Sequence, residues 1–358
     1  MSILDIYRTI EAELMANIAQ FFASGQSLLT DNALLWQMQK LNDLGALTRF
    51  NTQLIARYAG ITETELNTHL ENEGFKRLNE QERELSKAAV SGQLITPVNI
   101  SEDVALYSTL ATYQQNARDK LNLTNTNIVG NSSEKVKQIV NQTVAEVLSG
   151  VITPQQALTK NAVEFARSGI PAYVNYESNR QYSIEAYTQM IVRTTTNQVT
   201  ASMQMTRAES YGVDLLEISS HVGARPKCAV DQGKIYSRSG NSDKYPPFSS
   251  TSFGEVDGLF GINCGHNMYP FWEGKSRQAY KPIPKKENDK AYLESQKQRA
   301  LERNIRNAKR ELDFLKNTNL PHEEAQAKVS AAQAKMRSFI EDTGRTRRYA
   351  RERSISQE

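Results

Sequence analysis

The sequence predicts a mainly α-helical protein with a small irregular α+β module. It would consist of a helical N-terminal body, a Cys/His module and a C-terminal helical hairpin. Apolar residues recur at helical spacing up to residue 212 and again beyond residue 288, whereas glycine, serine, proline and aromatic residues cluster between 213 and 274. We therefore expect three segments: a helical body over 1–182, a long helix plus the Cys/His-containing module over 183–274, and a basic linker with a helical hairpin over 275–358.

The helical body begins with an apolar stripe at spacings of four, three, four and four residues: Ile3, Tyr7, Ile10, Leu14 and Ile18. Gly60-Ile61-Thr62 should interrupt the helix that follows, and the Asn/Thr-rich run 122–133 should be a loop. Asn131 with Glu134 is typical of a helix start that ends this loop. Thr153-Pro154, with Gln156 after it, predicts another start, and that helix should end near Gly169.

A long helix should run from about Ser183 to Tyr211-Gly212, where the helical period is lost. Beyond it the pattern predicts three short strands, at 215–218, 234–236 and 267–271. Two charged helical stretches, 289–315 and 322–340, are separated by a turn that contains Pro321. This arrangement predicts a helical hairpin.

The net charge of +3 conceals an asymmetry. Residues 275–358 hold 21 Lys+Arg and 12 Asp+Glu, a net of +9, which leaves −6 for residues 1–274. A basic tail suits nucleic acid, a membrane surface, an acidic partner or simply a solvated helix. No apolar run is long enough for a transmembrane helix, no secretion signal is expected, and two cysteines fit synthesis in a reducing cytoplasm.

Both cysteines lie in the irregular module, each near a histidine. The set His221, Cys228, Cys264 and His266 offers two thiolates and two imidazoles, which suit tetrahedral zinc. A small module with little core of its own would gain from such a metal. The spacing is not that of a zinc finger, so two buried thiols with backbone-bonded histidines, or a disulfide, stay open as alternatives.

Three further residues stand near this set. Arg225 could bind an anion or brace the loop by pairing with a carboxylate, and bracing is the expectation. Arg193 could dock the long helix onto the module through a salt bridge. Asp231 is assigned to the same structural or anion-bracing group.

Longer runs of the module resemble the signature of the phage minor capsid protein 2 family. The resemblance is specific over residues 180–275, and more distantly the module is similar to the Mu F-type head morphogenesis domain. The runs that carry it are Ile218 to Cys228, Asp231 to Tyr236, Tyr245-Pro246-Pro247, Gly258 to His266, Pro270-Phe271 and Gly274, with Val192-Arg193-Thr194 upstream.

The resemblance implies a structural minor capsid or head morphogenesis protein of a tailed bacteriophage, made in the host cytoplasm and located in the virion head. It would act at the portal or the inner head surface in assembly or in DNA packaging and ejection. The partners implied are the portal and/or the major capsid protein. The basic tail would contact packaged DNA through its phosphates, without sequence readout.

Family members often carry histidine where this chain has Cys228, and an aromatic residue at the position of Asp231. An exchange of histidine for cysteine preserves a zinc ligand, so the resemblance favours zinc at the four-residue set. The alternative function is a zinc-dependent nuclease or other phosphodiester-cleaving enzyme carried in the head. Four protein ligands would close the site, and no catalytic motif is found, so we expect no enzyme.

Overall fold

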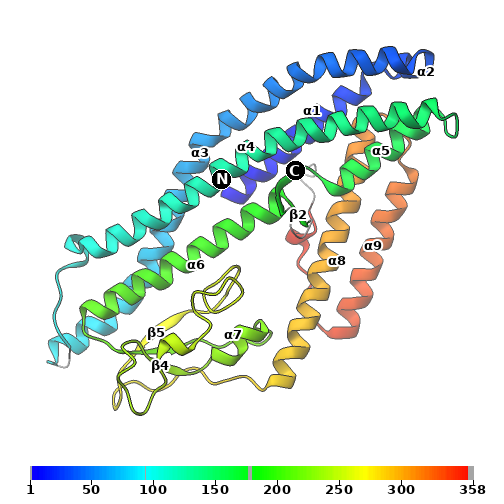
Figure 1. The fold of residues 1–358 in the computed structure, drawn as a ribbon. Helices are drawn as coiled ribbons and strands as arrows, with labels where there is room; N and C mark the ends of the chain where they lie inside the picture. The colour runs from blue at the N-terminus through cyan, green and yellow to red at the C-terminus, as the bar shows by residue number, and fades with distance from the viewer. Residues whose placement is uncertain (1, 93, 176–179, 354–358) are drawn as a thin grey trace. The chain divides into compact units, whose positions relative to one another are not determined.

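The computed structural model describes residues 2–92, 94–175 and 180–353 (Figure 1). It confirms a mainly helical chain with a small α+β module. The α-helices are α1 (Ile3–Ala23), α2 (Gln26–Asp31), α3 (Ala33–Val90), α4 (Val104–Leu148), α5 (Pro154–Ser168), α6 (Ile184–Ser210), α7 (Pro226–Asp231), α8 (Lys285–Asn317) and α9 (Glu323–Thr343). The strands are β1 (Pro171–Asn175), β2 (Arg180–Ser183), β3 (Leu215–Ile218), β4 (Ile235–Ser237) and β5 (Met268–Phe271).

The chain forms two compact units. Unit 1 combines residues 1–62, 121–188 and 296–358, and unit 2 combines 63–120 and 189–295. Helices α3, α4, α6 and α8 each contribute residues to both units. The three predicted segments, divided at 182/183 and 274/275, stay a prediction. Within the described part of the chain, no helix is long and apolar enough to cross a membrane.

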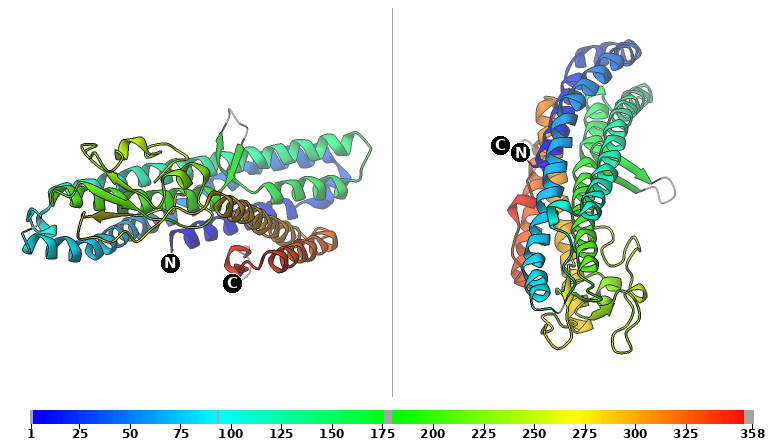
Figure 2. Two further views of the ribbon diagram at one scale, coloured as in Figure 1. Left: turned by 90° about the horizontal axis from the view of Figure 1, so that it is seen from below. Right: turned by 90° about the vertical axis from the view of Figure 1, so that its left-hand side faces the viewer.

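In unit 1, α1 lies along the parts of α3 and α4 that belong to this unit (Figures 1 and 2). The predicted stripe of α1 is buried, with Tyr7 and Ile18 fully covered. Side chains join the helices at their edges: the Tyr7 hydroxyl donates to Asn125 Oδ1 at 2.9 Å and the Tyr58 hydroxyl to Glu13 at 2.7 Å. The buried stripe therefore holds α1 in place by removing apolar surface from water.

The C-terminal hairpin is confirmed as α8 and α9, which run side by side (Figure 2). Ile305, Met336 and Phe339 form its small core. The buried Glu311 on α8 accepts hydrogen bonds from Arg167 on α5, one of them at 2.5 Å, and from Lys328 on α9 at 3.0 Å. A buried carboxylate with two cationic partners ties three helices of unit 1 together.

Two predicted interruptions of the helical body are wrong. Helix α3 continues through Gly60-Ile61-Thr62, and α4 continues through the whole Asn/Thr-rich run, including the helix start expected at Asn131. The physical reason is visible in α4, where small polar residues complete a buried stripe at helical spacing. Its members are Leu121, Thr124, Ile128, Ser132 and Val136.

The start at Thr153 is confirmed, with a capping box between Thr153 and Gln156, and Gly169 caps the end of the same helix. The β1–β2 pair that follows was not predicted. Residues 176–179, between these two strands, lie outside the described residues.

Unit 2 packs α6 against its portions of α3 and α4. Tyr113 and Ser202 hydroxyls lie 2.8 Å apart, and His69 Nε2 lies 3.1 Å from Thr196 Oγ1. A Cβ atom at Gly74 would stand 2.7 Å from the Met203 sulfur, so glycine permits this close approach. The three predicted strands are confirmed as an antiparallel sheet in the order β4-β3-β5, with β3 in the centre.

A buried arginine fixes the start of α4 and the end of α6 in unit 2. Arg207 is 2% exposed and donates to both carboxylate oxygens of Glu82, at 2.9 and 2.6 Å, and to Asp103 at 2.9 Å. It also donates to the Val98 carbonyl at 3.0 Å, and its guanidinium lies over the Tyr211 ring. Such a satisfied network is a structural connection among three helices.

Candidate metal centre

The sheet of unit 2 brings two distant segments of the module together. The centre strand β3 and the last strand β5 run antiparallel, so residues just after β3 lie beside residues just before β5. Ser219 and Asn267 close this junction through two hydrogen bonds, from Ser219 N to the Asn267 carbonyl at 2.9 Å and from Asn267 N to Ser219 Oγ at 2.8 Å. Because of this register, His221 and His266 are neighbours.

Three of the four predicted ligands converge. The ligand atoms of Cys228, Cys264 and His266 all lie within 4.8 Å of one another, and the three residues are 2%, 7% and 1% exposed. Both thiols are free, so the disulfide alternative is not formed here. In a tetrahedral zinc site, bonds of 2.0–2.3 Å place ligand atoms roughly 3.3–3.8 Å apart, so the cluster approaches the dimensions of such a site.

Gln232 contacts the nitrogen of His266 that points away from the cysteines. Its side chain is fully buried, and its Oε1 lies 3.2 Å from His266 Nε2. An amide oxygen only accepts, so this contact places the imidazole proton on Nε2 and leaves Nδ1 with its lone pair, 3.3 Å from Cys264 Sγ. A metal-ligating histidine usually has such a partner for its second nitrogen.

His221 stands apart from the other three predicted ligands. Its ring stacks on that of His266, with 4.4 Å between centroids and 27° between planes, and its side chain is exposed at the edge of the cluster. Partial desolvation and the neighbouring His266 lower the pKa of His221, so its ring is neutral at neutral pH. The structure therefore shows three converging ligand atoms, from two thiols and one imidazole, with a second imidazole, that of His221, beside them.

The two thiols differ in electrostatic environment. A hydrogen bond from Cys228 lowers the pKa of Cys264 to about 4, against the effect of burial. The same hydrogen bond, together with burial, raises the pKa of Cys228. The cluster thus favours a thiolate at Cys264, which is the ligand form for a soft metal ion.

Asp231 and Arg225 both hold the loop that carries Cys264. Asp231 is buried and accepts hydrogen bonds from Ser252 N at 2.9 Å and Ser252 Oγ at 2.5 Å. Arg225 immediately precedes α7 and donates to the Ile262 carbonyl at 2.5 Å. The Arg225 contact goes to a backbone carbonyl rather than to the carboxylate that the sequence suggested.

The long helix meets this loop through Thr194. The Asn263 N–H donates to Thr194 Oγ1 at 3.1 Å, beside a backbone in which Asn263 and Phe260 both take left-handed φ values of 57°. The predicted docking residue, Arg193, is exposed on the same helix. Left-handed non-glycine residues are strained, and here they aim Cys264 at the cluster.

Sequence reasoning assigned no role to Gln232 or Thr194. Gln232 lies four residues after Cys228, and its N–H closes α7 by donating to the Cys228 carbonyl at 3.0 Å. That spacing from a ligand was the available signal. Thr194 gave none, because buried threonines on a long helix are common packing residues.

Comparisons with known proteins agree with the resemblance at the module and extend it. The family model of phage minor capsid protein 2 matches residues 1–341. A structural protein of Lactococcus phage LL-H is 27% identical over 368 aligned positions, which cover 98% of each chain. A structural protein of Lactococcus phage mv4 is 34% identical over 118 positions, covering 31% of this chain and 92% of that protein.

No solved structure matches this chain. The family match includes residues of both units outside the Cys/His module, so the assignment does not depend on the module alone. The chain belongs to the phage minor capsid protein 2 family and is a structural minor capsid protein of a bacteriophage.

Proposed function

We propose that this minor capsid protein carries one zinc ion that closes its Cys/His module into a rigid docking piece. The observation behind the proposal is the buried convergence of Cys228, Cys264 and His266, with Gln232 holding the second nitrogen of the histidine. His221, the imidazole beside them, is the fourth ligand in this proposal. Four protein ligands fit a structural ion and leave no position for a substrate.

A metal suits this module because its chain is irregular. The module's strands contain only three or four residues each, and hydrogen bonds to Asp231, Arg225 and Thr194 hold the Cys264 loop. Joining Cys228 on α7 to Cys264 and His266 before β5 would fix both ends of that loop. The role we infer is therefore structural and not catalytic.

Elemental analysis of the purified full chain tests the zinc proposal. We expect one zinc per chain, lost in Cys228→Ser and Cys264→Ser, with about 10-fold weaker binding in Gln232→Ala. His322→Ala is the matched control, because this histidine lies at the start of α9, far from the cluster in sequence, and should keep its zinc. A wild-type chain without zinc, or a zinc content unchanged by both serine variants, would contradict the proposal.

A nuclease assay on the same samples tests the catalytic alternative. The structural role predicts no phosphodiester cleavage in either the wild type or His221→Ala. It also predicts that His221→Ala binds zinc more weakly, because one of four ligands is lost. Zinc-dependent cleavage by the wild type would overturn the structural role, whether or not His221→Ala retains it.

We further propose that the protein contacts the portal or the major capsid protein, and packaged DNA, from the inner head surface. Two tail cations are already neutralised: Arg306 pairs with Glu185 and Arg347 with Glu352. Lys335 and Arg337 on α9 are exposed and take part in no ion pair among the described residues. These two cations are the ones we assign to phosphate contacts.

Site-directed photo-crosslinking in particles tests this placement. A crosslinker at Lys335 should capture DNA in filled heads but not in empty proheads, whereas a crosslinker at the exposed Met38 on α3 should capture virion protein in both. Absence of the chain from both proheads and heads would refute the placement. Equal crosslinking of Lys335 in filled and empty particles would refute the DNA contact.

A further inference from the structure

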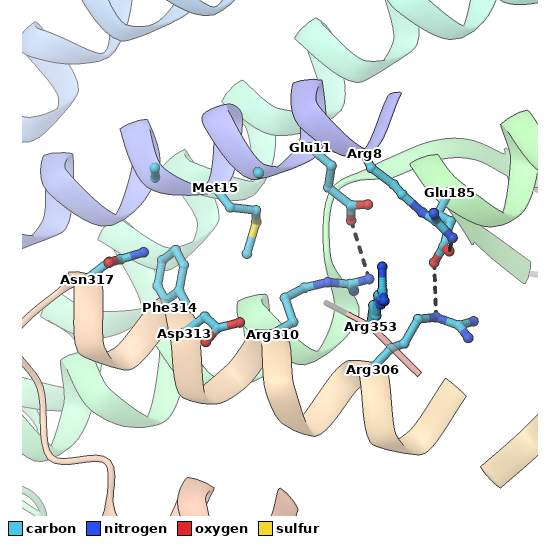
Figure 3. A pocket seen from close by; sticks show the side chains of 12 residues that line it. Arg8, Glu11, Met15, Glu185, Arg306, Arg310, Asp313, Phe314, Asn317 and Arg353 are labelled. Carbon is cyan, nitrogen blue, oxygen red and sulfur yellow. Dashed lines mark hydrogen bonds and ion pairs between the residues drawn. The ribbon is translucent and has the colours of Figure 1, made fainter. Parts of the chain in front are cut away.

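A cavity of about 60 Å³ lies inside unit 1, away from the Cys/His module in sequence (Figure 3). It is bounded by α1, the start of α6, the second half of α8 and Arg353. One part of its lining is apolar, formed by Ala12, Met15, Ala16 and Phe314. The other part is charged, so the cavity offers two chemically distinct ends.

Glu11 dominates the charged end. Its side chain is fully buried, and neither carboxyl oxygen takes part in a hydrogen bond with the described residues. Its nearest cation is Arg310, whose Nη2 lies 3.4 Å from Oε1 (Figure 3). Buried polar groups in native proteins nearly always have a partner, so an unpartnered carboxyl that faces a cavity points to a bound group.

The arginines around the cavity differ in how many ion pairs and hydrogen bonds they form. Arg8 and Arg306 both bind Glu185, each at 3.0 Å, and Arg306 also donates to the Arg351 carbonyl. Among the described residues, the one ion-pair partner of Arg310 is Glu11, at the long distance of 3.4 Å. Arg353 is exposed and has no ion pair within the described ranges. Donors of Arg310 and Arg353 are therefore available to a ligand.

The charge balance of the lining favours an anion. Four arginines face three carboxyl groups: those of Glu11, Glu185 and Asp313. Burial raises the pKa of Glu11, against the opposing effect of Arg310, which shifts this balance further toward positive charge. A protonated Glu11 would donate a hydrogen bond to a carboxylate.

We propose that this cavity binds a carboxylate carried on a short apolar stem. The carboxylate would accept hydrogen bonds from Arg310 and Arg353 and from Glu11, while the stem would lie against Met15 and Phe314. The volume admits a group the size of a few water molecules, which suits a branched chain of four or five carbons. Such a group could be a free small acid or the chain terminus of another virion protein.

Titration of the full chain with isovalerate tests the chemistry. We expect saturable binding, detected by ligand-observed NMR. The uncharged isostere isovaleramide should bind at least about 10-fold more weakly, because charge-assisted hydrogen bonds are lost. Inorganic phosphate tests the stem: tighter binding of phosphate than of isovalerate would overturn the proposal, as would equal binding of acid and amide.

Two variants locate the binding. Ala16→Phe should abolish it by filling the apolar end, whereas Ala334→Phe, at an exposed position of α9, should leave it unchanged. Arg353→Gln should weaken it about 3- to 10-fold, whereas Arg348→Gln, an exposed neighbour that does not line the cavity, should not. Circular dichroism verifies folding of each variant. Undiminished binding by a folded Ala16→Phe variant would overturn the assignment.

A peptide comparison identifies the source of the carboxylate. Acetyl-Gly-Gly-Leu with a free C-terminal carboxylate is compared with isovalerate and with its own C-terminal amide. Tighter binding of the acid peptide supports capture of a partner's chain terminus, and tighter binding of isovalerate supports a free acid. Both results keep the carboxylate site, and indifference of the peptide and isovalerate to their amides would remove it.

Discussion

The two units each bury a charged side chain on a helix, with opposite outcomes. In unit 2, Arg207 is surrounded by two carboxylates, a carbonyl and a tyrosine ring. In unit 1, Glu11 is equally buried but lies beside a single guanidinium at 3.4 Å and takes part in no hydrogen bond among the described residues. The satisfied charge serves architecture, whereas the unsatisfied one faces a cavity and is available to a ligand.

Because the two buried charges differ in their partners, the carboxyl groups of Glu82 and Glu11 affect the stability of the fold in opposite directions as pH changes. Burial alone would raise the pKa of Glu82, but hydrogen bonds from Arg207 and Tyr211 outweigh it and lower that pKa. At Glu11 burial prevails over Arg310, and the pKa is raised. Glu82 therefore stabilises the fold above its unfolded pKa and loses this contribution in acid, whereas Glu11 costs stability as pH rises above its unfolded pKa.

Removing Arg207 should have the largest effect. Arg207→Met leaves Glu82 and Asp103 buried without their cation, so we expect the free energy of unfolding to fall by about 3 kcal/mol. Urea denaturation followed by circular dichroism at neutral pH measures this change. Adding Glu82→Gln and Asp103→Asn should recover more than half of the loss. A loss below about 1 kcal/mol would show that the network is not a stabilising connection.

Replacing Glu11 should have a smaller effect with a diagnostic pH dependence. The folded pKa lies above the ordinary value of 4.5, so the wild type loses stability as pH rises from that value toward the folded pKa. Glu11→Gln has no such loss. Its stability relative to the wild type should therefore rise between pH 4.5 and pH 8, reaching on the order of 1 kcal/mol.

Urea denaturation of both Glu11 forms at three pH values across this interval measures the effect. A variant that is less stable than the wild type at pH 8, with the gap widening as pH rises, would mean that the Glu11 carboxylate is well satisfied. That result would also weaken the case for a ligand in the cavity.

The smallest effect belongs to an ion pair at the surface of unit 2. Arg238 and Glu209 lie 2.9 Å apart, but their side chains are 27% and 62% exposed. Arg238→Gln should change the free energy of unfolding by less than about 0.5 kcal/mol, because solvent screens the pair. A loss comparable with that of Arg207→Met would show that the contribution of an arginine to stability depends on its ion pair and not on its burial.

Local sequence signals correctly predicted the elements that depend only on residues close in the sequence. The Thr153 capping box, the left-handed end at Gly169 and the three short strands all needed only nearby residues. The expected breaks at Gly60 and at 122–133 failed because tertiary burial overrides weak local propensity. Thr124 and Ser132 read as loop residues, yet both are buried on one face of α4.

In the candidate site, too, some features could be predicted from the sequence and others depend on the fold. The sequence placed two cysteines and two histidines in one irregular module, and the chemistry of these side chains suggested a metal. It could not show that Cys228, Cys264 and His266 converge while His221 stacks beside them, because that depends on the antiparallel register of β3 and β5. It also gave no role to Gln232, whose amide meets His266 only after α7 packs.

By itself the sequence determined that the chain is mainly helical, that its Cys/His module stands apart, and that it resembles phage minor capsid proteins. These properties reside in spacing and side-chain chemistry, which are local. Only the tertiary structure decided which charges are buried with partners and which are not. Arg207 and Glu11 are single charged residues on helices in the sequence, and the groups that packing brings to each give one a structural role and the other a place in a cavity.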